Sequence, residues 1–339
     1  MTEKTPGDTY GRFDWLALRQ EDPIDPAIEI VDSHHHLWDM PTSRYLAAEL
    51  NADVSSSHNV THTVFIECRY AYDEGPNHLQ PVGETRAVAS QAELMAELGP
   101  ARISAIVGFA DMSLGAAVGE VLDAHIEAGR GLFRGIRHGT NLSTEPAARR
   151  GHQRPEPNMM LDPTFADGVR ELARRGLSFD AWMYHDQLHE LVALARAVPE
   201  ASIVLNHFGG PLNVGRYADN AAESWSMWHS SLIAASTCPN VVVKVGGLGM
   251  DHQFGTGWSD LDAPPTSQQV ADRWRPWVEA TIEAFGPDRT MFESNFPIDR
   301  QCLTYPVVWN ALQRLAIGYS PDERAAMFSG TAKRVYSIG

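Results

Sequence analysis

The chain has 339 residues, of which 43% are hydrophobic and 21% are charged, a composition typical of a folded globular protein. Its 27 basic and 43 acidic residues give a formal net charge of -16, which argues against binding to nucleic acid, because holding phosphates needs a basic face. No apolar run approaches the ~18 residues that would predict a membrane-spanning helix, so no membrane partner is expected.

The cysteines and the N-terminal residues both favour a reducing compartment. Cys68, Cys238 and Cys302 are far apart and form no CxxC pair, so neither a disulfide framework nor a structural zinc site is expected. The first residues, MTEKTPGDTYGRFDW, are polar and lack the apolar stretch of a secretion signal. We therefore expect a cytoplasmic protein in which residues 1–27 form a surface arm and residues 28–339 form one domain.

Eight short runs of β-branched and aliphatic residues follow one another along the chain. They occupy residues 28–35, 62–68, 102–110, 131–139, 177–184, 202–210, 240–247 and 290–297. Segments with helical periodicity occupy residues 83–98, 113–129, 162–176, 186–198, 267–285 and 320–336. Most runs are continuously apolar at first, as in parallel strands that are covered on both faces. Eight such units predict an α/β protein with a single (β/α)8 TIM barrel, which typically takes ~250 residues plus insertions. A doubly wound sheet is the alternative, but no GxGxxG follows the first run.

Two long connections lack helical periodicity. Residues 140–160 follow the fourth run, and residues 247–267 follow the seventh. In a barrel both would rise over the C-terminal face, where substrates bind. They are candidates for lids, and ordinary surface loops are the alternative.

Polar side chains gather at the C-terminal ends of the predicted strands. They are Asp32, His34, His36, Glu67, Arg137, His138, Tyr184, His185, Asn206, His207, Lys244, Glu293, Asn295 and Asp299. Because the strand ends of a barrel meet at one mouth, many of these groups are expected within reach of a single small molecule.

The triple histidine at residues 34–36 divides into two inward residues and one outward residue. Side chains alternate between the faces of a strand, so Asp32, His34 and His36 should share one side, with His35 on the other. Two imidazoles at H-x-H spacing can be two ligands of one cation, or two hydrogen-bond donors to one substrate oxygen. We expect His35 to be structural.

Three motifs carry a resemblance to a known family. D-S-H-H-H-L-W-D begins at Asp32, V-L-N-H-F-G-G-P at Val204, and E-S-N-F-P-I-D at Glu293. In this order they resemble the amidohydrolase superfamily, and more narrowly its amidohydrolase-2 branch of TIM-barrel hydrolases. That branch includes lactonases such as L-fuconolactonase, 4-sulfomuconolactonase and 2-pyrone-4,6-dicarboxylate lactonase, together with metal-dependent decarboxylases. The resemblance covers the chain from about residue 28 onward.

The resemblance implies that His34, His36 and His207 bind either a divalent cation, zinc or manganese, or the substrate carbonyl without any metal. The sequence also differs from the family pattern at one position. Relatives carry an aspartate in a motif like S-D-W-P, where it activates the hydrolytic water, but this chain has Asn295 there. An amide side chain cannot act as a general base, so Asn295 is expected to orient the water or bind substrate.

Another acidic residue must then accept the proton in a hydrolysis. Glu67 at the mouth is the first choice. Glu293, two residues before Asn295 on the same face, and Asp299 in the following loop are the alternatives. For Glu293, a buried ion pair with a strand arginine or lysine is an equally open reading.

Cationic and aromatic residues near the mouth indicate the substrate. Arg69, Arg137 and Lys244 lie at strand ends of an otherwise acidic protein, and an arginine fork suits a carboxylate. Aromatic residues near the same rim could line a pocket for a flat ring, or simply pack. They are Trp38, Trp182, Tyr184 and Phe296.

We expect a hydrolase that opens a lactone or related cyclic ester of a small carboxylated molecule by attack of water. The alternatives are a metal-dependent, non-oxidative decarboxylase of an aromatic or dienoic acid, which the asparagine disfavours, and a barrel that binds a small molecule without turning it over. Assembly into a homo-oligomer is compatible with the sequence.

Overall fold

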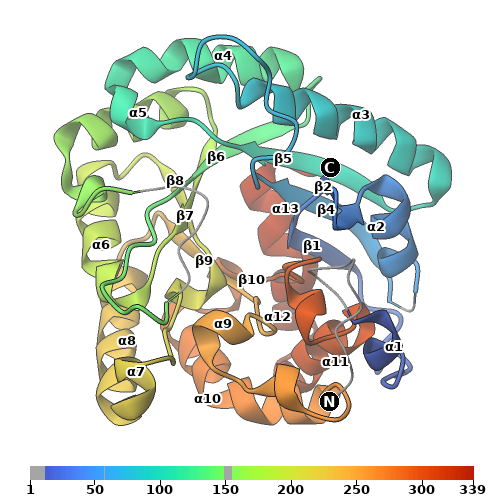
Figure 1. Cartoon of the computed structure of the whole chain (residues 1–339). Coiled ribbons are helices and arrows are strands. Elements are labelled where there is room, and N and C mark those ends of the chain that lie inside the picture. The colour runs from blue at the N-terminus through green and yellow to red at the C-terminus, as the bar shows by residue number, and fades with distance from the viewer. Residues whose placement is uncertain (1–11, 57, 149–154) are drawn as a thin grey trace.

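Eight parallel strands run around the centre of the molecule, with helices outside them (Figure 1). The computed structural model describes residues 12–56, 58–148 and 155–339. In spatial order the strands are β1 (Ile30–His35), β4 (Val60–Ile66), β5 (Arg102–Gly108), β6 (Phe133–Gly139), β7 (Ser178–Trp182), β8 (Ser202–Leu205), β9 (Val241–Val245) and β10 (Thr290–Phe292). Spatial order follows chain order, so every connection leads to the neighbouring strand.

The first and last strands meet at the end of β10. A parallel bridge joins His35 to Phe296, and the His36 N–H donates to the Phe296 carbonyl (2.8 Å). The Asn295 N–H donates to the His34 carbonyl (2.9 Å). These contacts close the sheet at its C-terminal edge, which confirms the predicted (β/α)8 barrel.

Helices cover the outside of the barrel and follow most strands. The longer ones are α3 (Val82–Leu98), α4 (Gly119–Ala128), α5 (Pro163–Arg174), α6 (Leu188–Ala197), α8 (Ala221–Ser236), α10 (Ser267–Phe285) and α11 (Tyr305–Leu315). The shorter ones are α1 (Phe13–Leu16), α2 (Ala47–Val54), α7 (Arg216–Asp219), α9 (Asp251–Phe254), α12 (Pro321–Ala325) and α13 (Thr331–Tyr336). A hairpin of β2 (Trp38–Met40) and β3 (Ser43–Tyr45) follows β1. None of the described helices is long and apolar enough to cross a membrane.

Local sequence explains where several helices begin. The Asp162 side chain accepts the Thr164 N–H (2.8 Å), and Pro163 occupies the first turn of α5, where no N–H is needed. Thr266 and Gln269 form a reciprocal capping box at the start of α10. These caps satisfy N–H groups that the helix itself leaves unpaired.

At the N-terminal ends of its strands, the barrel is filled by apolar side chains and closed by the C-terminal helix α13. The interior cluster comprises Val31, Val64, Ile66, Ala105, Val107, Val204 and Met291, with Ala332, Tyr336 and Ile338 from α13 and the residues after it. Burying each large aliphatic side chain contributes about 1.5–3 kcal/mol. Since this end is packed shut, the reactive side chains have room only at the opposite, C-terminal end of the strands.

The N-terminal arm binds the long loop that follows β9. Arg12, Trp15 and Arg19 donate side-chain hydrogen bonds to backbone carbonyls of residues 259, 261 and 264, at 2.8–3.0 Å. Residues 1–11 of the arm, and residues 149–154 of the loop after β6, lie outside the described part of the chain. The arm therefore fixes the loop of residues 247–267, which contacts the site described next.

Candidate active site

The end of β1 is irregular, and this irregularity decides where its side chains point. The pairing with β4 shifts register between Asp32 and His35. As a result the Asp32 carboxylate accepts hydrogen bonds from Ser294 Oγ (2.6 Å) and from the hydroxyl of Tyr305 on the outer helix α11 (2.9 Å). The expectation that Asp32 shares a side with His34 was therefore wrong, because a β-bulge interrupts the alternation. Burial raises the pKa of Asp32 to about 6.

His34 and His36 do lie together, and His35 does not join them. The two Nε2 atoms of His34 and His36 are 3.2 Å apart. The His35 ring packs edge-to-face against Phe65 of the outer core, with centroids 6.0 Å apart. The alternation expected for these three residues is thus present.

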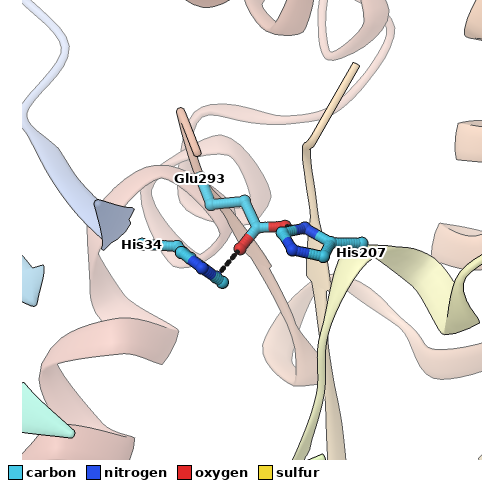
Figure 2. A group of neighbouring side chains, drawn as sticks. All are labelled: His34, His207 and Glu293. Atoms are coloured by element: carbon cyan, nitrogen blue, oxygen red, sulfur yellow. Dashed lines mark hydrogen bonds and ion pairs between the residues drawn. The ribbon is translucent and has the colours of Figure 1, made fainter. Parts of the chain in front are cut away.

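Glu293 joins the histidines of two strands. Its Oε2 lies 2.7 Å from His34 Nδ1, and its Oε1 lies 2.6 Å from His207 Nδ1. Figure 2 shows the carboxylate between the two rings, with Glu293 rising from the end of β10. The side chains of His34 and Glu293 are fully buried, and that of His207 is 3% exposed. Glu293 Oε1 accepts the His207 Nδ1 proton and so fixes that imidazole in one tautomer, whereas Oε2 is in contact with His34 Nδ1 without a hydrogen bond.

The hydrogen bonds and the burial together give these rings a defined protonation. Burial lowers the pKa of His34 well below its usual value, and the Lys244 charge adds to this effect. Burial also lowers the pKa of His36 well below its usual value, with a further contribution from Arg137. His36 Nδ1 lies 2.8 Å from the Ile66 carbonyl, which can only accept, so this nitrogen carries the proton. Arg137 Nη1, which can only donate, lies 3.3 Å from His34 Nε2, so the Nε2 atoms of His34 and His36 carry lone pairs.

This arrangement fits a divalent cation. His34, His207 and Glu293 bring nitrogen and carboxylate donor atoms within 4.8 Å of one another, so they form a candidate site for an ion. Two imidazole nitrogens bound to one tetrahedral zinc at ~2.0–2.1 Å would lie about 3.3 Å apart. The lone pairs of His34 and His36, 3.2 Å apart, have this spacing. The mixed nitrogen and carboxylate donors suit zinc and manganese.

Arg137 and Glu67 form a buried ion pair beside the histidines. Arg137 Nε donates to Glu67 Oε1 (2.8 Å), and Arg137 Nη2 donates to the Glu67 carbonyl. Arg137 Nη1 lies 3.3 Å from His34 Nε2. The guanidinium is thus aligned by Glu67 and turned toward the histidines. A carboxylate committed to an arginine is a poor proton acceptor, so the first choice for the base is disfavoured.

Asn295 and Asp299 join the end of β10 to the loop after β9. Asn295 Nδ2 donates to Asp299 Oδ1 (2.8 Å), and the Gly249 N–H donates to Asp299 Oδ2 (2.8 Å). Burial raises the pKa of Asp299 well above its usual value. Asn295 adopts a left-handed conformation with φ 56°, which asparagine tolerates better than most residues. The pair holds the loop of residues 247–267 against the site.

Three residues expected to contact substrate are almost fully buried. Lys244 is fully buried in the barrel, and its Nζ pairs with Asp180 Oδ2 at 2.8 Å. Tyr184 is 1% exposed and packs in a cluster with Leu212. Trp38 is 4% exposed and stacks behind His36, with centroids 6.3 Å apart.

Arg69, by contrast, is exposed on the turn that follows β4. Within the described residues, its guanidinium makes no hydrogen bond or ion pair, so its charge remains available. Of the three cations expected at the mouth, Arg69 alone is not committed to a neighbouring acidic group.

Comparison with known proteins places this site in a family. A family model described as Amidohydrolase matches residues 31–338. An uncharacterized protein of Sinorhizobium fredii is 32% identical over 326 residues, which cover 92% of this chain and 99% of that protein. The chain belongs to the amidohydrolase family. This confirms the resemblance carried by the three motifs.

Other relatives of this amidohydrolase extend over nearly the whole chain. A protein from Burkholderia multivorans named L-fucono-1,5-lactonase is 27% identical over 323 residues, or 91% of this chain and 96% of that one. Crystal structures of an amidohydrolase from Burkholderia multivorans, one with bound HEPES and one with bound zinc, align with TM-scores of 0.68 and 0.66. Each is 22% identical and covers 91% of this chain and 99% of that chain, which shows a shared fold.

Two features of this amidohydrolase were underestimated from sequence. Glu293 was considered as a base or a partner of a cation, whereas it binds two histidines. The Trp182 ring lies edge-to-face against His207, with centroids 4.8 Å apart, and is only half-buried. Trp182 stands two residues before Tyr184, and this same-face spacing was the available signal.

Proposed function

We propose that this amidohydrolase opens a lactone by attack of water at the barrel mouth. The carrying observation is the Glu293 carboxylate between His34 and His207, which accepts the His207 Nδ1 proton and leaves the His207 Nε2 as an acceptor in a buried site. A relative that spans 91% of the chain bears the name of a lactonase, which supports this reaction class. Opening a cyclic ester requires a proton acceptor for water and positive charge for the developing oxyanion.

The proton acceptor that we propose is His207. Its Nδ1 donates to Glu293 Oε1 (2.6 Å), so its Nε2 is free to take a proton from water. A carboxylate that orients an imidazole in this way also stabilises the imidazolium that forms, as in serine hydrolases. This pair supplies the base that the asparagine at position 295 cannot supply.

Positive charge at the mouth comes from Arg137. Its guanidinium is held by Glu67 and directed at His34, so it is preorganised for an oxyanion in the same place. A zinc or manganese ion would be held by the Nε2 atoms of His34 and His36, which lie 3.2 Å apart, and this leaves the His207 Nε2 as the proton acceptor. When bound, the cation would supply Lewis-acid polarisation of the ester carbonyl and a more acidic water.

The substrate would be a small lactone that carries a carboxylate or a similar anionic group. Arg69 supports this proposal, because its charge has no partner among the described residues. The exposed part of Trp182 beside His207 would pack against the ring of the lactone. An arginine-to-carboxylate contact would offset the repulsion from a chain of net charge -16.

The proposal is tested with purified protein and a panel of sugar, muconic and pyrone lactones, with acid release as the signal. We expect hydrolysis of at least one member, and a loss of about 10²–10⁴-fold in kcat for His207→Ala. His35→Asn is the matched control, because His35 faces the outer core, and it should retain activity. If the panel gives no hydrolysis above that of His207→Ala, the proposed reaction is wrong.

Metal dependence is measured separately by elemental analysis, chelation and readdition of zinc or manganese. We expect a stoichiometric ion that His34→Ala releases and His35→Asn retains. Full lactonase activity in fully chelated protein would assign the polarising role to Arg137 and the histidines alone.

A further inference from the structure

A buried glutamate of α3, Glu84, accepts hydrogen bonds from the backbone of the turn that follows β4. The N–H groups of Cys68 and Tyr70 both donate to Oε1 of Glu84, at 3.0 and 2.7 Å. Glu84 lies in the first turn of α3 and is completely buried. A single side-chain oxygen thus satisfies two backbone donors on either side of Arg69.

This turn has a backbone that requires such support. Arg69 and Ala71 have φ values of 68° and 52°, in the left-handed region that residues with a side chain seldom adopt. Conformations of this kind persist only where surrounding contacts enforce them. The start of α3 presses directly on the turn, because a Cβ added to Gly83 would lie 2.5 Å from the Ala71 carbonyl oxygen.

The turn is also continuous with the site. Cys68 follows Glu67, whose carboxylate and carbonyl both accept from the Arg137 guanidinium. Arg137 in turn lies against His34. A displacement of the backbone at residue 68 would therefore move the acceptors that aim Arg137, and would turn Arg69 away from its present place.

We propose that Glu84 is a positioning residue of this active site. It holds the turn of residues 68–70 so that Glu67 aligns Arg137 and the turn presents Arg69 to substrate. The role of the turn in substrate binding rests on the proposed lactonase function, whereas its dependence on Glu84 does not.

The chemistry that this role needs is a carbonyl-type acceptor, not a charge. Burial, together with the nearby Glu67 carboxylate, raises the pKa of Glu84 to about 8, so the group is largely protonated at neutral pH. Glutamine preserves an acceptor oxygen at the same reach, aspartate is one methylene too short, and leucine removes the acceptor while filling the space.

The experiment compares Glu84→Gln, Glu84→Asp and Glu84→Leu with Val88→Ala. Val88 is buried one turn further along α3, so its truncation destabilises the same helix without removing a contact to the turn. Two quantities are measured: hydrogen exchange of peptides that cover residues 67–71, and kcat and KM on the lactone that the protein hydrolyses best.

For Glu84→Leu we expect exchange in the turn at least about 10-fold faster, and a fall in kcat/KM of about 10–100-fold, the effect of a small displacement in an active site. Glu84→Gln should stay within about 3-fold of the parent in both, and Val88→Ala should change neither. Should Glu84→Leu fail to fold, Glu84→Asp carries the same expectation.

The proposal is overturned if the turn stays as protected in Glu84→Leu and Glu84→Asp as in the parent. It is also overturned if Glu84→Gln loses as much activity as Glu84→Leu, because the charge would then matter. Exchange requires no substrate, so a protein that hydrolyses no lactone would still show whether Glu84 holds the turn.

Discussion

Among the described residues of the barrel, two buried polar clusters can be compared, one deep between the strands and one at the mouth. In the deep cluster, Asp180 Oδ2 accepts hydrogen bonds from Lys244 Nζ (2.8 Å), Tyr336 Oη (2.8 Å) and Asn206 Nδ2 (3.2 Å). One negative charge thus meets one positive charge and two neutral donors. At the mouth, Glu293 accepts the His207 Nδ1 proton and lies 2.7 Å from His34 Nδ1, and the imidazoles present unprotonated Nε2 atoms.

The two clusters differ in how many of their hydrogen-bonding groups find a partner within the protein. Buried charges are tolerated when they are paired and hydrogen-bonded, and the deep cluster meets that condition within the protein itself. The mouth cluster leaves lone pairs that need a proton, a cation or a substrate. Depth in the barrel therefore separates polar residues that stabilise the fold from those available for chemistry.

The largest predicted effect breaks the deep cluster. Lys244→Met leaves Asp180 buried with no cation, and we expect a loss of about 3–5 kcal/mol in the free energy of unfolding, measured with urea. The double variant Lys244→Met with Asp180→Asn should recover much of that loss, because no charge remains unpaired. Equal stability of the single and double variants would contradict the assignment of this pair.

The next effect falls on the mouth cluster. Glu293→Gln replaces one carboxylate oxygen by an amide donor and removes the negative charge, so the hydrogen bond that sets the His207 tautomer and the contact with His34 Nδ1 cannot both be kept. We expect kcat/KM for lactone hydrolysis to fall by about 10²–10⁴-fold, with the free energy of unfolding changed by about 1–3 kcal/mol. Glu190→Gln, which alters a buried carboxyl on the outer helix α6, is the control and should retain activity.

Most of the fold could be predicted from the sequence because its strands are apolar runs and most of its helices are amphipathic. Besides four short helices, the two longer helices α8 and α11 were missed, for a physical reason. α11 buries nine of its residues, and these include the polar Asn310 and Gln313, so its polar side chains do not mark a face exposed to water. α8 buries a narrow stripe that includes Ser224, while Met227 and Ile233 on other faces are exposed.

The histidines of the site were predictable, but the partners of the charged residues were not. His34, His36 and His207 follow apolar runs directly, and strand ends meet at one mouth. A cationic side chain near a strand end reaches the mouth only if it lies high enough in the barrel and is not paired with an acidic residue of another strand. Lys244 and Asp180 are 64 residues apart in the chain, and no local pattern marks that pairing.

Glu84 can be compared with the buried carboxyls of Asp180 and Glu293. Its charge is removed by a bound proton and not balanced by a cation. Its folded-state pKa, raised to about 8 from the ordinary 4.5, means that folding favours the protonated form. Its contribution to stability is therefore full below about pH 4.5 and is lost as the pH rises toward about 8. Glu84→Gln removes this titration.

We expect Glu84→Gln to gain stability relative to the parent between pH 5 and pH 8.5, by about 1–3 kcal/mol, in urea unfolding at each pH. The parent and the variant should converge toward pH 5. Parallel curves across this range would show that Glu84 is ionised in the folded protein at neutral pH.

The smallest effect is predicted for a variant that removes one hydrogen bond from the deep cluster and leaves its ion pair intact. Tyr336→Phe removes one hydroxyl that donates to Asp180, while Lys244 and Asn206 still hold the carboxylate. We expect a loss of about 1–2 kcal/mol in the free energy of unfolding and an unchanged kcat, because the mouth cluster makes no contact with this hydroxyl. The comparison variant, Tyr305→Phe on the outer helix α11, removes a hydroxyl bond to Asp32, whose Oδ1 accepts the His34 N–H (3.3 Å) at the end of β1. If depth separates structure from chemistry, Tyr305→Phe should lower kcat more than Tyr336→Phe at a similar cost in stability, and equal effects of both on kcat would refute that separation.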